Sequence, residues 1–153
     1  MELFALSDRV SRLEAQLSAA HGVARLHTLV ELAWHLRQRD TRRTIALAEE
    51  AEALFDAFPL PESERAALTA RLQCIRGEAE RLFGELDAAQ ELADRSLAAF
   101  TTLNDGIGCS DAYWLLAGIA GDRGDATRRD ACLEKASLRA HAAGDALRAS
   151  VAE

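Results

Sequence analysis

The side chains that most often catalyse reactions or bind metals occur in this chain without the spacing that such sites need. His27 and His35 stand eight residues apart, and neither HExxH nor a comparable metal-ligand spacing is present. The segment DGIG at residues 105–108 lacks the Lys and the Ser or Thr of a phosphate-binding loop. The acidic cluster EEAE at residues 49–52 is typical of a solvated helix face. We therefore expect no catalytic site, no metal and no cofactor.

Nucleophilic side chains are equally isolated. No serine lies in a nucleophile motif such as GxSxG. Cys74, Cys109 and Cys132 are an odd number at wide spacings, which fits neither a disulfide framework nor the paired cysteines of a zinc site. We expect these cysteines to be reduced, small core residues.

The residue types fit molecular recognition better than catalysis. Arg25, Arg71 and Arg81 lie within helical patterns, and a guanidinium pairs with a carboxylate through two parallel hydrogen bonds. Trp114 can provide a flat apolar anchor. Whether these side chains share one surface depends on the helices that carry them.

The composition predicts an all-α chain. Of the 153 residues, 49% are hydrophobic but only 5% are aromatic, so alanine and leucine, which are strong helix formers, supply most of the apolar surface. The net charge of -7 opposes general binding to nucleic acids or anionic lipids, because these polyanions attract clustered Lys and Arg. The start MELFALSDRV lacks the basic region of a secretion signal, and no window supplies the ~18 apolar residues of a membrane span. We expect a cytoplasmic protein without nucleic-acid or membrane partners.

Two stretches of the chain repeat one pattern at a spacing of 40 residues. Gly84 and Gly124 each stand in a short turn between helical patterns, and Asp105 and Asp145 each precede a further one. Glycine adopts such a turn without steric cost. A lone helical hairpin cannot bury its apolar stripe, so hairpins of this kind stack. We expect one domain over residues 1–153, with an N-terminal helix at about 7–22, repeat units at 24–58, 61–103 and 106–143, and the start of an interrupted fourth unit at 144–153.

The segment RLQCIRGEAERLFGELDAAQELADRSLAAF, residues 71–100, resembles the tetratricopeptide repeat (TPR) family. Its residues near the family's small and aromatic positions are Gly77, Gly84, Ala89, Ala93 and Phe100. Ser96 replaces the usual alanine, no proline closes the unit, and the 40-residue spacing exceeds the family's 34 residues. The resemblance covers the chain from about Arg25 onward. It implies a TPR-like α-solenoid of about three helical hairpins that binds other proteins.

Two further phrases are similar to the amino-terminal TPR-like regions of bacterial signalling proteins. They are LAWHLRQRDTRRTIALAEEAEAL and DAYWLLAGIAGDRGD. Some of those proteins carry a carboxyl-terminal GGDEF diguanylate cyclase, nucleotide cyclase or histidine kinase domain, whose catalytic motifs are absent from this sequence. The resemblance implies a regulatory or sensory domain of a longer signalling protein.

In stacked hairpins, the first helix of each unit lines a concave surface. If the first unit is aligned so that Leu26 is equivalent to Leu72, the positions flanking the core stripe predict a partner-binding groove formed by Arg25, His35, Arg71, Glu78, Arg81 and Trp114. Three arginines and a histidine on a net acidic chain favour an acidic or carboxylate-bearing peptide. The alternative is that these arginines pair with nearby glutamates, and that Trp34 and Trp114 pack between repeats. The asparagine and lysine set of carboxylate-clamp TPR domains is missing, which disfavours a chaperone-tail receptor.

Three functional hypotheses follow from these observations. The first is a non-catalytic protein-protein interaction module, acting as the regulatory N-terminal domain of a bacterial signalling protein of the diguanylate cyclase type. The second is a free-standing TPR scaffold or adaptor, and the third is a small-molecule sensor with a pocket near Trp34 and Trp114. Self-association into a homodimer, through the first helix or an exposed last repeat around Val151, is compatible with all three.

Overall fold

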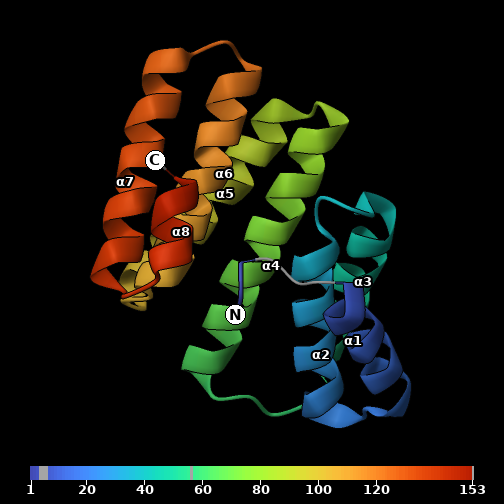
Figure 1. Cartoon of the computed structure of the whole chain (residues 1–153). Coiled ribbons are helices and arrows are strands. Elements are labelled where there is room, and N and C mark those ends of the chain that lie inside the picture. Colours follow the sequence, from blue (N-terminus) through green and yellow to red (C-terminus); the bar gives the residue numbers. More distant parts are fainter. Residues whose placement is uncertain (4–6, 56, 153) are drawn as a thin grey trace.

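The chain folds into helices joined by short loops (Figure 1). The computed structural model describes residues 1–3, 7–55 and 57–152, and no strand occurs among them. The helices are α1 Ser7–Ala19, α2 Gly22–Leu36, α3 Thr41–Leu54, α4 Glu62–Phe83, α5 Leu86–Thr102, α6 Gly106–Asp122, α7 Ala126–Ala142 and α8 Ala146–Val151. The all-α fold that the sequence predicts is confirmed.

The helices pack as consecutive pairs, as expected of a helical-hairpin repeat. Helix α2 packs on α3, α4 on α5, and α6 on α7, while α1 precedes them against α2 and α8 follows against α7. Contacts between α2 and α4, and between α4 and α6, join neighbouring pairs. Figure 1 shows α8 and the start of the chain on the near side of α4 and α6. We call the surface formed by α2, α4, α6 and α8 the inner face.

Four aspartates begin helices in the same way. Asp40, Asp105, Asp125 and Asp145 each accept a side-chain hydrogen bond from the backbone N–H three residues later. Such a cap satisfies an N–H group that the first turn leaves unpaired, and it stabilises a helix by about 0.5–2 kcal/mol. The repeat of Asp105 at Asp145 therefore has a structural reason, because these residues cap the inner helices α6 and α8.

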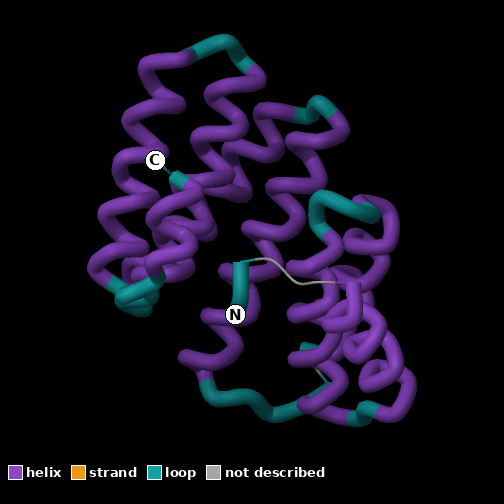
Figure 2. Tube along the Cα trace, in the orientation of Figure 1, coloured by secondary structure: helices purple, strands orange, loops and turns teal. Residues whose placement is uncertain are grey.

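The turn glycines have the conformation that the sequence predicts. Gly84 and Gly124 have φ angles of 87° and 76°, in the left-handed region that other residues adopt with strain. They end the first helices of the second and third hairpins. Figure 2 shows these turns to be short, whereas a longer loop containing Pro59 and Pro61 joins α3 to α4.

Small residues let the two helices of each hairpin approach closely. Ala51, Ser96 and Ala136, which the repeat pattern places at equivalent positions, are fully buried. Ser96, which stands where the TPR family usually has alanine, donates a hydrogen bond from Oγ to the Ala70 carbonyl oxygen at 2.9 Å. The serine therefore joins α5 to α4 by a side-chain hydrogen bond that an alanine could not make.

Two helical glycines mark the closest contacts between hairpins. A β-carbon on Gly77 would lie 2.8 Å from Leu115 Cδ2, and one on Gly108 would lie 2.3 Å from Phe100 Cδ1. Both distances are well below van der Waals contact. Helix α6 therefore sits against α4 and α5 only because these positions have no side chain.

Candidate functional site

A buried carboxylate joins three of the four inner helices. Asp111 of α6 accepts hydrogen bonds from Arg71 Nη1 of α4 at 2.6 Å and from Arg148 Nε of α8 at 2.8 Å. Arg148 also pairs with Asp145, which caps the same helix. The Asp111 side chain is 2% exposed, so its charge is shielded from water by the two guanidinium groups. This network fixes the positions of α4, α6 and α8 relative to one another.

A tryptophan of α2 contacts two guanidinium groups. The Arg37 carbon Cζ is 3.7 Å from the centroid of the Trp34 ring, and that of Arg71 is 4.5 Å from it. Arg71 also lies 4.9 Å from the Phe100 centroid. Such cation–π contacts are strongest where water is excluded, and Trp34 is only 2% exposed. Trp34 is thus held rigidly on the inner face.

Arg37 is the least compensated of these charges. It donates one hydrogen bond, from Nη1 to the Trp34 carbonyl oxygen at 2.6 Å, and no described carboxylate lies within ion-pair distance. Burial lowers the pKa of Arg37 from its ordinary value. The inner face therefore contains a guanidinium with unused donors.

A second ion-pair cluster lies towards the carboxyl ends of α4 and α6. Arg81 donates to Glu78 Oε1 at 3.0 Å and to Asp122 Oδ2 at 2.7 Å, and Gln38 donates to Glu78 Oε1 at 2.7 Å. The hydrogen bonds that Arg81 donates to Glu78 raise the pKa of Arg81, so it stays charged. A β-carbon on Gly118 would lie 3.1 Å from Arg81 Nε, so this glycine leaves room for the guanidinium.

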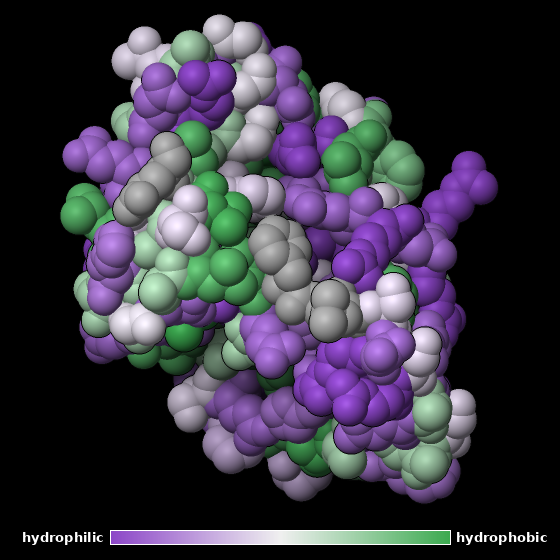
Figure 3. Space-filling view, viewed as in Figure 1, coloured by the Kyte–Doolittle hydropathy of each residue, from purple (hydrophilic) through white to green (hydrophobic). Residues whose placement is uncertain are grey.

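A pocket of about 400 Å³ opens on the inner face beside this cluster. Residues from α4, α6, α7 and α8 line it, including Glu78, Arg81, Trp114, Gly118, Arg129, Leu133 and Val151. Figure 3 shows apolar surface over α8, next to the start of the chain, and α8 leaves Leu147 and Val151 exposed. The pocket thus combines an apolar wall with a charged rim.

The structure brings together some of the predicted groove residues and not others. Glu78, Arg81 and Trp114 line the 400 Å³ pocket. Arg71 lies deeper on the same face, where it is 7% exposed and bound to Asp111. Arg71 and Arg81 both pair with carboxylates of the chain itself, Arg71 with an aspartate and Arg81 with a glutamate.

Arg25 and His35 do not line this pocket. Arg25 donates to Glu50 Oε1 of α3 and to the Leu17 carbonyl oxygen of α1, both at 2.8 Å, so it lies among the first three helices. The His35 side chain is fully buried, and neither of its ring nitrogens has a hydrogen-bond partner. Burial lowers the pKa of the His35 ring, which therefore stays neutral.

Arg25 and His35 lie away from the pocket because the register of α2 against α4 differs from the one that the sequence alignment assumed. Side chains of neighbouring inner helices meet at a separation of 40 residues, as Gln38 does with Glu78 and Arg71 does with Asp111. The alignment that equates Leu26 with Leu72 departs from that spacing and turns the wrong side of α2 inward. Trp34, Cys74 and Trp114 follow the 40-residue spacing, and a small pocket on the inner face is lined by all three. That regular spacing is the signal that identifies Trp34 as an inner-face residue.

The described residues show no activated cysteine, no metal-binding cluster and no membrane-spanning helix. All three cysteines are free and buried, as the sequence predicts, and burial raises the pKa of Cys74 to about 12, so its thiol is not an activated nucleophile. No cluster of three or more His, Cys, Asp or Glu side chains in the described part is arranged to hold a metal ion. Within the same residues, no helix has the length and apolar character needed to cross a membrane.

No protein-family model matches this sequence, and no curated protein matches it significantly.

Proposed function

We propose that this chain is a non-catalytic, TPR-like protein-interaction module that binds its partner on the inner face. The observation that carries the proposal is the pocket of about 400 Å³, in which Trp114 and Val151 provide apolar surface beside Arg81 and Arg129. Tryptophan and arginine are both enriched among the residues that contribute most to binding at the centre of protein interfaces. The fixed ion-pair networks around the pocket hold its walls in place before a partner arrives, which lowers the entropy lost on binding.

The charges of the pocket favour a partner with a carboxylate group. Arg81 already pairs with Glu78 and Asp122, but the Asp122 side chain is 44% exposed and can move away. Among the described residues, Arg129 forms an ion pair with its neighbour Asp130 alone, and these side chains are 48% and 65% exposed. An acidic residue of the partner can therefore compete for Arg129 and Arg81 at the rim while an apolar side chain contacts Trp114.

Two adjacent arginines of α7 provide a matched test. Arg129 lines the pocket and the exposed Arg128 does not. A partner isolated from native cell extract should bind Arg129→Glu about tenfold more weakly than the wild type, which corresponds to about 1.4 kcal/mol, while Arg128→Glu binds unchanged. Trp114→Ala should weaken binding further, by about 2 kcal/mol or more. A partner that binds all three variants equally well does not use the inner face.

We further propose that the module is the regulatory N-terminal part of a bacterial signalling protein, such as one with a GGDEF diguanylate cyclase domain. Support comes from the two phrases that resemble such regions. Sequencing the gene beyond the codon for Glu153 tests this directly. A cyclase or kinase domain there supports the regulatory role, whereas a stop codon favours the free-standing adaptor.

A small-molecule sensor is the second candidate, because about 400 Å³ lies within the range of about 300–1,000 Å³ that ligand pockets occupy. Trp114 lines this pocket, so a bound metabolite should change the tryptophan fluorescence. A metabolite panel that changes the fluorescence of the wild type but not of Trp114→Phe would favour the sensor. Silence across the panel would count against it.

A further inference from the structure

The first three residues of the chain lie across the inner face as a bound peptide would. Trp34 Nε1 of α2 donates a hydrogen bond to the Glu2 carbonyl oxygen at 2.8 Å, and Arg148 Nη2 of α8 donates one to the Met1 carbonyl oxygen at 2.8 Å. The Leu3 side chain is 6% exposed. The segment therefore spans the inner face from its first helix to its last.

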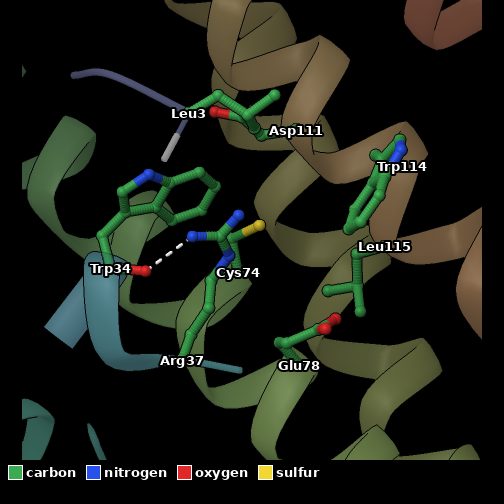
Figure 4. A pocket seen from close by; sticks show the side chains of 8 residues that line it. All are labelled: Leu3, Trp34, Arg37, Cys74, Glu78, Asp111, Trp114 and Leu115. Carbon is green, nitrogen blue, oxygen red and sulfur yellow. Dashed lines mark hydrogen bonds between the residues drawn. The ribbon is translucent and has the colours of Figure 1, made fainter. Parts of the chain in front are cut away.

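Leu3 is one wall of a small pocket beneath this segment. Figure 4 shows Leu3 at the top, Trp34 on one side, Trp114 on the other, and Arg37 and Glu78 below. Only about 10 Å³ of the pocket remains empty, which is about the space of one water molecule. The Leu3 side chain thus nearly closes it.

The donors that hold the segment are fixed by the rest of the fold. Trp34 makes cation–π contacts with Arg37 and Arg71, and Arg148 is bound by Asp111. Trp34 and Arg148 are 2% and 4% exposed. Because their partners on the segment are main-chain carbonyl groups, any extended peptide can accept the same two hydrogen bonds. The small pocket at Leu3, in which Trp34, Trp114 and Leu115 provide the apolar surface, then selects among peptides by one side chain.

The small pocket and the larger one are neighbours on the inner face. Glu78 and Trp114 line both, and the chain's own segment contributes Leu3 to the small pocket and no residue to the 400 Å³ pocket. Arg37 also lines the small pocket with unused donors, and the buried charged residues comprise three arginines, Arg37, Arg71 and Arg148, against Glu78 and Asp111. A longer segment with a carboxylate can therefore make contacts that Met1–Leu3 does not make.

We propose that Met1–Leu3 is a built-in occupant of the inner face, and that the partner is an extended peptide segment of another protein that displaces it. The partner places an aliphatic side chain in the Leu3 pocket and its remaining residues in the 400 Å³ pocket, where a carboxylate can pair with Arg81 or Arg129. This inference rests on the proposed function, since it assigns the chemistry of the partner for the same face. Self-occupation weakens the apparent affinity for the partner, because only the fraction of molecules with an open inner face can bind it.

The chain's own sequence supplies the probe. A synthetic heptapeptide MELFALS, labelled at its carboxyl end, is titrated with the full chain and followed by fluorescence anisotropy. The Leu3→Asp variant, in which the occupant no longer fits the pocket, should bind the peptide at least about tenfold more tightly than the wild type, because a tethered occupant acts at about millimolar effective concentration. The peptide MEDFALS should bind that variant at least about tenfold more weakly. Equal binding of MELFALS to Leu3→Asp and wild type would overturn the proposal.

Two controls keep this result interpretable. Leu82→Asp, at an exposed leucine of α4 outside both pockets, should behave like the wild type. Leu3→Ala is a milder second variant that should show the same direction of change if Leu3→Asp unfolds. Light scattering should find the wild type monomeric. A dimer that Leu3→Asp dissociates would mean that the segment occupies a second copy of the chain, which contradicts self-occupation.

The two proposals can fail separately. If a partner depends on Trp114 and Arg129 but binds Leu3→Asp and wild type with equal affinity, the proposed function stands and the built-in occupant is refuted. If MELFALS binds Leu3→Asp as expected but no partner depends on Trp114 or Arg129, the occupant is confirmed and the proposed function fails.

Discussion

Asp111→Asn removes the buried charge that joins three inner helices, and we expect a large loss of stability. The side chains of Asp111, Arg71 and Arg148 are 2%, 9% and 4% exposed. After the change, Arg71 has no carboxylate partner among the described residues, whereas Arg148 keeps Asp145. Breaking a buried ion pair by removing one partner costs about 3–5 kcal/mol, because the other charge is left without compensation.

The lower end of that range applies here. Arg148 retains one carboxylate, and Arg71 keeps its contacts with the rings of Trp34 and Phe100. We therefore expect Asp111→Asn to reduce the free energy of unfolding by about 3 kcal/mol. In a chain of this size, 1 kcal/mol lowers the Tm by about 2–4 °C, so the expected loss is about 6–12 °C. Urea and thermal unfolding at neutral pH, followed by far-UV circular dichroism, measure both quantities.

Asp122→Asn is the matched control. Asp122 also pairs with an arginine, Arg81, but its side chain is 44% exposed, and exposed ion pairs contribute about 0–1 kcal/mol. The double variant Asp111→Asn with Arg71→Gln should lose less stability than the sum of the two single changes, because the uncompensated guanidinium is gone. If Asp111→Asn costs no more than Asp122→Asn, the buried network does not hold the inner helices together and this reasoning is refuted.

Three further predictions concern packing, reactivity and pH. Gly108→Ala should destabilise the fold by about 1–3 kcal/mol in urea unfolding, because the added β-carbon overlaps Phe100. Gly121→Ala should be neutral or stabilising, because its β-carbon meets no atom closer than 3.6 Å. Equal effects of the two substitutions would contradict this account of the packing. Cys74, whose pKa burial raises to about 12, should resist alkylation at about pH 8 in the native chain and react in urea, and rapid native labelling would show that its burial is incomplete. His35 has a lowered pKa, so the unfolded chain takes up its proton at a higher pH than the folded chain, and stability should fall as the pH drops below about 6.5. Between about pH 7.5 and pH 5.5 in urea, wild type should therefore lose more stability than His35→Leu, and parallel losses would contradict this assignment.

Local features of the fold could be predicted because they depend on residues close together in the sequence. The conformation of Gly84 and Gly124 and the all-α content follow from turn chemistry and composition. The repeat of Asp105 at Asp145 likewise reflects a cap that each residue makes within its own helix. These interactions are the same wherever the helix is placed in the fold.

The inner face could be predicted only in part, because it depends on how α2 lies against α4. Hydrophobic periodicity shows which stripe of α2 is apolar, but Trp34 and His35 are both buried. Trp34 contacts Arg71 of α4 on the inner face, whereas the ring nitrogens of His35 have no hydrogen-bond partner. A spacing of 40 residues separates Trp34 from Cys74 and Cys74 from Trp114, and it gives the correct register of α2 against α4. Sequence alone does not decide between this spacing and the longer one that equates Leu26 with Leu72. A contact between the helices decides it, such as the hydrogen bond that Gln38 donates to Glu78.

Contacts between the two ends of the chain lay beyond sequence reasoning. Arg148 and Met1 are 147 residues apart, and their hydrogen bond depends on the accumulated rotation of the hairpins that separate them. Nothing in the residues around Met1 marks them as a ligand of the inner face. The same holds for Asp111 as the acceptor for two arginines from different helices.

Competition on the Leu3→Asp variant tests the central claim most directly, namely that one face binds both the partner and the chain's first residues. Labelled MELFALS is bound to the variant, and the partner isolated from cell extract is then added while the anisotropy is recorded. We predict that a saturating amount of partner returns the anisotropy to that of the free peptide. An anisotropy that stays at the bound value, while the partner demonstrably binds the same molecules, would show that the partner site lies elsewhere.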